Sequence, residues 1–221
     1  MNIMQEEINK IDDWIMRVSD WNRSCGTDPM NDDMYQSQVN ACKEELKELR
    51  DKGIGKDDET EIKDGVADVI VTMGYLAFLN NKRGQSANPD FNVDLSAFCH
   101  YNEVIESHLP LLDSMPNRIA TDTAYYFYKL GQFILGMRHT EELDRYIEAV
   151  LDSNDTKVLK GMEKEAIDDQ VSIAKEKYGN EFNPDGITYV QTGPDTGVIR
   201  ANHGNGKILK PSVYKTPQEF L

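Results

Sequence analysis

The chain has 221 residues, a formal net charge of −15 and 39% hydrophobic residues. This composition is ordinary for a globular protein, and the length is enough for one sizeable core with a small appended lobe. So acidic a chain would repel the phosphate backbone of DNA or RNA, which argues against nucleic-acid binding. No apolar run approaches the roughly 20 residues that cross a bilayer, so we expect no membrane partner.

The N-terminal segment and the cysteines indicate a cytoplasmic protein. Residues 1–14 are amphipathic and acidic, without the basic and apolar regions of a secretory signal. Cys25, Cys42 and Cys99 are odd in number and widely spaced, so they favour neither a disulfide framework nor a zinc site. We therefore expect a reducing setting and ordinary thiols.

The hydrophobic pattern predicts a mainly α-helical protein. Apolar residues recur at three- and four-residue steps, and clusters rich in Gly, Pro, Asn and Asp separate these segments. From Val66 onward one segment is apolar nearly all round, which is typical of a helix buried in a bundle. The expected helices cover about 2–22, 33–52, 58–81, 93–109, 117–137, 141–151 and 160–178.

The pattern changes to short strands after Tyr178. Residues 187–191, 197–201 and 207–210 have strand character, and the sequences GPDTG and HGNG supply the turns between them. We expect a small antiparallel β meander that packs on or beside the helices. The predicted organisation is a helical domain over 1–178 and a β extension over 179–221.

The helix predicted over 33–52 carries acidic residues beside its apolar face. At 100° per residue, Glu45 and Glu48 border the apolar stripe centred on Cys42, whereas Glu44 points away from it. The spacing therefore separates Glu45 and Glu48, as candidate site residues, from a solvated Glu44.

The next helix carries a second acidic set, formed by Glu61, Asp64 and Asp68. These three residues fall within an arc of about 60°, on a face that continues into apolar residues. Buried carboxylates are costly, and several of them together repel one another. We expect no lysine or arginine of this stretch to share their helical phase, so Mg²⁺ or Mn²⁺ would be the neutralising group.

A plainer interpretation of the acids is a solvated helix surface, because acidic pairs three residues apart are common on helices. The second acidic set favours metal binding over this alternative, since the link between the helices is short enough to force antiparallel packing.

At these residues the chain resembles the all-α nucleotide pyrophosphohydrolase superfamily, which includes MazG proteins, dimeric dUTPases, dCTP pyrophosphatases and phosphoribosyl-ATP pyrophosphohydrolase. The signature of this group is ExxE followed by ExxD on the next helix. Glu45 and Glu48 match the first half, and Asp68 matches the signature aspartate. Gly65 stands where the second half has glutamate, so the resemblance makes Asp64 the substitute.

The resemblance extends to the C-terminal region. SNDTK at 153–157 and GKILKPSVYKTP at 206–217 are similar to segments of phage and bacterial phosphoribosyl-ATP-pyrophosphohydrolase-like proteins. By the same comparison, about 85–150 looks like an insertion or elaboration within a MazG-like helical catalytic domain.

The resemblance implies Mg²⁺-dependent hydrolysis of a (deoxy)nucleoside triphosphate to the monophosphate and pyrophosphate. It further implies a homodimer or homotetramer that controls deoxynucleotide pools, in the host cytoplasm if the chain is phage-encoded. Glu45 is the expected base that orients and deprotonates water, and it is also a candidate metal ligand. The other expected metal ligands are Glu48, Asp64 and Asp68, with Glu61 as a further one.

The run from Thr196 to Gln218 contains no Asp or Glu, although it holds several cations. One interpretation is that lysines at strand edges prevent edge-to-edge pairing. The other is that they meet the triphosphate on the side away from the metals. The residues expected to bind substrate in this way are Lys207 and Lys210 from this run, together with Asn154 and Lys157 from the SNDTK segment.

Asn22 is a candidate for base recognition and equally a helix-capping residue. Trp14 and Trp21 either stack on a base or pack in the core. Two rival functions remain: hydrolysis of phosphoribosyl-ATP, and a non-catalytic acidic binding protein or DNA mimic. The second rival predicts acids that spread over the surface and do not converge.

Overall fold

Helix α3 (Glu59–Lys82) is the central element of the computed structural model, which describes residues 3–84, 124–125, 128–129, 131–132 and 140–221. From its second turn this helix is enclosed by other elements, as its all-round apolar sequence predicts. Its side chains in the main apolar core include Val66, Val69, Ile70, Met73, Tyr75, Leu76 and Leu79.

Helix α2 (Asp32–Glu48) packs antiparallel to α3. Its N-terminus is capped by the Asn31 side chain, which accepts a hydrogen bond from the Met34 backbone N–H at 3.0 Å. The helix was expected to continue to about residue 52, and the backbone stays helical over this range, although not as one α-helix. After Glu48 the backbone widens into a π-helical turn, η1 (Leu49–Gly53), followed by a 3₁₀ turn, η2 (Ile54–Lys56).

A close approach between α3 and the end of α2 is possible because position 65 is glycine. A Cβ atom built on Gly65 would lie 3.1 Å from the Cα atom of Leu49. The neighbour is backbone and cannot rotate away, so a side chain here requires the two elements to move apart by a few tenths of an ångström. The fully buried Leu49 fills the space that results.

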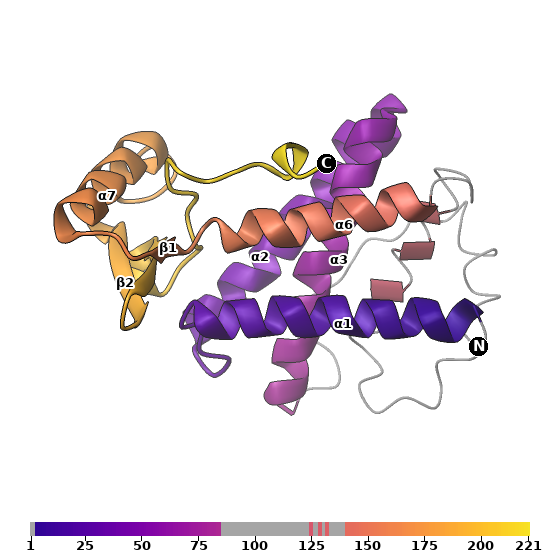
Figure 1. Ribbon diagram of the computed structural model, residues 1–221, viewed down its shortest axis with the longest axis horizontal. Helices are drawn as coiled ribbons and strands as arrows, with labels where there is room; N and C mark the ends of the chain where they lie inside the picture. Colours follow the sequence, from indigo (N-terminus) through magenta and orange to yellow (C-terminus); the bar gives the residue numbers. More distant parts are fainter. Residues whose placement is uncertain (1–2, 85–123, 126–127, 130, 133–139) are drawn as a thin grey trace.

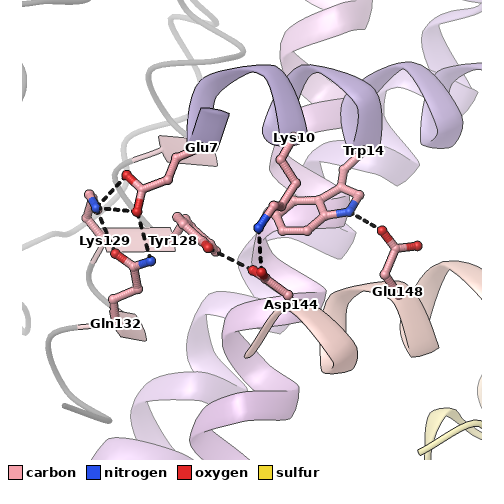
Figure 2. Close-up of polar contacts among 8 residues, drawn as sticks. All are labelled: Glu7, Lys10, Trp14, Tyr128, Lys129, Gln132, Asp144 and Glu148. Atoms are coloured by element: carbon pink, nitrogen blue, oxygen red, sulfur yellow. Dashed lines mark hydrogen bonds and ion pairs between the residues drawn. The ribbon is translucent and has the colours of Figure 1, made fainter. Parts of the chain in front are cut away.

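Helices α1 (Ile3–Ser24) and α6 (Thr140–Asp155) lie side by side across α3 and run in the same direction (Figure 1). Their polar contacts join residues at a nearly constant sequence separation, as parallel helices require. Trp14 Nε1 donates to Glu148, and Arg17 Nη2 pairs with Asp152. Figure 2 shows this seam, including the hydrogen bond that Tyr128 donates to Asp144 at 2.7 Å.

The predicted helices over 93–109 and 117–137 lie outside the described residues, apart from a few positions within the second, which are helical. Of these, Tyr125 and Tyr128 are fully buried in the main core. The helix predicted over 141–151 is confirmed as α6, which is longer at its C-terminal end.

The C-terminal region forms a small antiparallel sheet with the strand order β1–β3–β2 (Figure 1). Strands β2 (Thr188–Gly193) and β3 (Thr196–Arg200) match the first two predicted strands. The third prediction is wrong, because residues 207–210 contribute a single bridge, from Ile208 to Arg200. The third strand is instead β1 (Leu159–Lys160), and the helix predicted from residue 160 therefore begins later, as α7 (Lys164–Tyr178).

Helix α7 and the sheet share a second apolar cluster, separate from the main core. This cluster begins at Leu159, upstream of the predicted start of the β extension, and its buried members are Leu159, Ala174, Ile187, Ile199, Ala201 and Leu209.

After the sheet the chain returns along the end of α6 (Figure 1). Ser153 on α6 fixes this return, since it lies 2.6 Å from the Tyr214 hydroxyl and donates to the Lys215 carbonyl at 2.9 Å. The described helices include none with the length and apolar character needed to cross a membrane.

We expect Gly65→Val to destabilise the protein by about 1–3 kcal/mol, because overpacking against backbone forces the helices apart. Urea unfolding measures the change. Thr60→Val on the exposed first turn of α3 is the control for the cost of valine in a helix, and we expect it to stay within about 0.5 kcal/mol of wild type. Equal effects of the two substitutions would show that the Gly65–Leu49 contact does not limit the packing.

Candidate functional site

A cavity of about 370 Å³ lies where α2 and α3 face the end of α6 and the returning C-terminal segment. Its lining contains four acids, of which Glu45, Asp64 and Asp68 come from α2 and α3 and Glu181 follows α7. The rest includes residues from the second half of the chain. The predicted substrate-binding residues among them are Asn154, Lys157, Lys207 and Lys210.

The antiparallel pair of helices explains how the acidic wall forms. Asp64 and Asp68 are four residues apart on α3 and therefore share one face. Glu45 comes from the facing helix α2, where it is half-buried, while its neighbour Glu44 is exposed. The helical phase that separated Glu45 from Glu44 in the sequence is confirmed.

The carboxylates of this cavity are held in unfavourable surroundings. Burial raises the pKa of Asp68 well above its usual value, and the nearby charges of Glu45 and Asp64 raise it further. Burial likewise raises the pKa of Glu45 and of Asp64. In addition, Asp64 Oδ1 is buried without a hydrogen-bond partner in the described part of the chain. Each of these observations indicates a wall that lacks positive counter-charge at close range.

Lys157 is the most enclosed of the three lysines that line the cavity. Burial lowers the pKa of its ammonium to about 8, and the charge of Lys210 adds to the effect. Its Nζ donates to Asn154 Oδ1 and lies 5.7 Å from the centre of the Trp21 ring and 5.9 Å from that of Tyr214. These contacts fix the ammonium in one place without supplying a carboxylate partner at ion-pair distance.

Two of the predicted metal ligands, Glu48 and Glu61, are exposed and do not line the cavity. Glu48 pairs with Lys52 at 2.8 Å, and its side chain remains 53% exposed. The expectation that no cation of this stretch would neutralise the acids is therefore wrong for Glu48. Lys52 stands one turn further along, on the same side of the chain.

The side chains at this site are of the type that binds a hard divalent cation, but they are not close enough together to form a complete site. Carboxylate oxygens are the ligands that Mg²⁺ prefers, and the orphaned Asp64 oxygen with its raised pKa would be satisfied by one. Across the described segments, however, no three Asp, Glu, His or Cys side chains are close enough together to hold an ion. Metal binding at Glu45, Asp64 and Asp68 therefore stays a prediction.

A second, smaller cavity of about 140 Å³ adjoins the first and shares Glu45, Asn154, Lys157 and Lys207 with it. The remaining predicted residue, Asn22, lies here, where its amide donates to the Val18 carbonyl at 3.1 Å. Sequence reasoning did not select three other members, Gln38, Tyr75 and Arg200. Arg200 is one of the cations of the acid-free run, whereas Gln38 and Tyr75 show only a polar group beside an apolar stripe, which is too common to select them.

Searches with the chain find no matching family model, no matching curated protein and no matching solved structure. The residues and the geometry above are therefore what an assignment of function must be based on.

We expect Asp68→Asn to stabilise the metal-free protein at neutral pH. A carboxyl whose pKa is raised by folding contributes stability below its unfolded pKa, and that contribution is lost as the pH rises through the folded pKa. In EDTA, the free energy of urea unfolding of wild type should fall by about 1 kcal/mol or more between pH 5.5 and 8.5. The variant should not show this fall. The exposed Asp13→Asn is the control. A variant that follows wild type throughout would contradict the assigned environment of Asp68.

Proposed function

We propose that the protein is a Mg²⁺-dependent nucleoside triphosphate pyrophosphohydrolase, which converts a (deoxy)nucleoside triphosphate and water to the monophosphate and pyrophosphate. One observation carries the proposal: acids from the first third of the chain and lysines from the last third line the same cavity. A volume of about 370 Å³ lies in the range of small-molecule sites, roughly 300–1,000 Å³.

The mixed charge of the cavity indicates the kind of ligand. A simple anion would be repelled by Glu45, Asp64 and Asp68, and a lone cation by Lys157, Lys207 and Lys210. A polyphosphate accompanied by a divalent cation matches both sets, because the cation meets the carboxylates while free phosphate oxygens meet the ammonium groups. When bound by Glu45, Asp64 and Asp68, Mg²⁺ would supply neutralisation of phosphate charge and polarisation of the reacting phosphorus–oxygen bonds.

Glu45 has the properties of a general base for the attack of water. Burial and the charge of Glu48 raise its pKa, which strengthens a carboxylate as a proton acceptor. It also lines both cavities, so it stands where their contents meet. Lys157 and its partner Asn154 also line both cavities, and there the ammonium would offset phosphate charge.

The convergence of the acids distinguishes this proposal from a non-catalytic acidic binding protein. Glu45, Asp64 and Asp68 turn toward one cavity, whereas a surface mimic of DNA needs its acids in solvent. The alternative of phosphoribosyl-ATP as substrate uses the same chemistry, so that compound belongs in the panel of substrates to be tested.

The decisive experiment measures pyrophosphate release from the common NTPs, dNTPs and phosphoribosyl-ATP with Mg²⁺. We expect Glu45→Gln to lower kcat about 10²–10⁴-fold, the usual contribution of a general base. Glu6→Gln, an exposed acid on α1 outside the cavity lining, is the control and should retain near-wild-type activity. If no compound in the panel releases pyrophosphate, or if both variants behave alike, the proposal fails.

A second experiment tests the cationic wall. Lys157→Gln should lower kcat/KM about 10–100-fold, because a charge-assisted hydrogen bond contributes roughly 1.5–3 kcal/mol. Lys215→Gln is the control, since Lys215 belongs to the same acid-free run but is exposed and outside the cavity lining. A loss that is equal in both variants would show a general effect of charge and no specific role for Lys157.

A further inference from the structure

The two walls of the larger cavity, of about 370 Å³, belong to different parts of the molecule. Its carboxylates on α2 and α3 stand beside the main core, whereas Lys207 and Lys210 follow β3, which packs in the second apolar cluster. Since the two clusters are separate, neither core alone fixes the distance between the walls. That distance therefore depends on contacts that cross from one part to the other.

Arg200, the last residue of β3, makes such a crossing contact. Its Nη2 donates to the Cys25 carbonyl oxygen at 3.1 Å and to Thr27 Oγ1 at 2.6 Å, both in the loop that follows α1. Its Nη1 donates to the Gly206 carbonyl oxygen at 2.8 Å, directly before Lys207. One side chain, only 3% exposed, therefore joins the α1–α2 loop to the turn that leads to a lysine of the cavity.

Backbone hydrogen bonds tie Lys207 to the position of Arg200. The Ala201 N–H donates to the Lys207 carbonyl oxygen at 3.1 Å, and the Gly206 N–H donates to the Ala201 carbonyl oxygen at 2.9 Å. The turn over 201–206 is thus closed on the residue that follows Arg200. A displacement of Arg200 would move Lys207 with it.

The loop after α1 also packs closely against the sheet. The end of α1 lies toward the sheet (Figure 1), and a Cβ atom built on Gly26 would lie 3.2 Å from Thr192 Cγ2 in β2. Gly26 has a φ of +70°, a conformation that glycine adopts without strain. The loop therefore reaches the sheet at two places, through this packing and through Arg200.

The shape of arginine suits this place more than its charge does. All three of its acceptors are neutral, and burial lowers the pKa of the guanidinium. A buried cation that faces neutral acceptors is not a favourable source of stability. The planar guanidinium, however, holds its N–H groups in a fixed fork and can donate to two segments at once. A lysine ammonium on its flexible stem does not reproduce that geometry.

We propose that Arg200 is a positioning residue for polyphosphate binding, which sets the spacing between the lysine wall and the carboxylate wall of the larger cavity. It does so by joining the α1–α2 loop to the 201–206 turn, and it acts through Lys207 without lining the larger cavity itself. The inference rests on the proposed function for the class of ligand, a polyphosphate with a divalent cation.

Calorimetric titration with inorganic pyrophosphate and Mg²⁺ tests the inference, because pyrophosphate is the product of the proposed reaction and is not turned over. We expect Arg200→Lys, which keeps the charge and loses the fork, to weaken binding about tenfold. This factor corresponds to the loss of roughly one charge-assisted hydrogen bond between a displaced lysine and the ligand. No binding of pyrophosphate to wild type would overturn the proposal.

Ile199→Val is the control for a general loss of stability. Ile199 precedes Arg200 in β3 and is fully buried, so loss of one methylene should lower the melting temperature by about 2–4 °C. Well below that temperature, its affinity for pyrophosphate should equal that of wild type. If Arg200→Lys likewise changes the melting temperature alone, Arg200 has a structural role only and the proposal is wrong.

Thr27→Val removes the hydroxyl acceptor at the other end of the connection and leaves the sheet unaltered. We expect about a two- to fivefold loss of pyrophosphate affinity, since the Cys25 carbonyl oxygen still holds Arg200. The double variant should lose no more than Arg200→Lys alone, because both substitutions break one connection. Additive losses would contradict the proposal. If Arg200→Lys does not fold, unchanged affinity in Thr27→Val would contradict it equally.

The assay of pyrophosphate release separates this inference from the proposed function. Weaker pyrophosphate binding by Arg200→Lys, without release from any nucleotide by wild type, would support the inference and refute the proposed activity. Release by wild type with unchanged pyrophosphate affinity in Arg200→Lys would do the reverse. Where both hold, kcat/KM should fall about tenfold in Arg200→Lys and stay near wild type in Ile199→Val.

Discussion

The close antiparallel packing of α2 on α3 is the constraint on which the rest of the structure depends. It is made where Gly65 meets the backbone of Leu49, so closely that a Cβ atom at position 65 would lie 3.1 Å from the Cα atom of Leu49. Because the helices approach so closely there, Glu45 faces the same space as Asp64 and Asp68. Burial of α3 beneath α1 and α6 then removes these carboxylates from much of the water that would otherwise solvate them.

The acids are tolerated because a distant part of the chain supplies the opposite charge. The C-terminal segment returns to α6 through Ser153 and Tyr214, and this return brings Lys210 and Lys207 to the cavity. The balance is incomplete, since folding raises the pKa of Asp68 and lowers that of Lys157. A fold that keeps both kinds of group in unfavourable surroundings gives up stability at this place, as proteins do at functional sites.

The sequence was a good guide to features that depend on local periodicity. The helical phase distinguished Glu45 from Glu44, and the all-round apolar pattern after Val66 identified the buried helix. The same arithmetic misplaced Glu48, because phase gives a direction around the axis and says nothing of how far along the axis the neighbouring wall extends. Glu48 instead forms an exposed ion pair with Lys52 on the next turn.

Features that depend on tertiary contacts were beyond sequence reasoning. The alternation in 207–210 is typical of a strand, yet one bridge forms, because the chain must leave the sheet to reach α6 and Pro211 cannot donate to a ladder. The smaller cavity was even less predictable from the sequence. Trp21, Gln38 and Arg200 come from the end of α1, from α2 and from β3, and no local pattern relates them.

Position 65 joins the fold to the proposed chemistry. Glutamate at this position, as in the signature that the sequence resembles, would require the backbone at Leu49 to move by a few tenths of an ångström. Moving the carboxylate to Asp64 avoids that conflict. The pair Asp64 and Asp68 keeps an i, i+4 relation on one face of α3, and both line the cavity with Glu45. The departure from the signature is thus compatible with the site, because the glycine that removes one carboxylate also permits the helix contact that brings the others together.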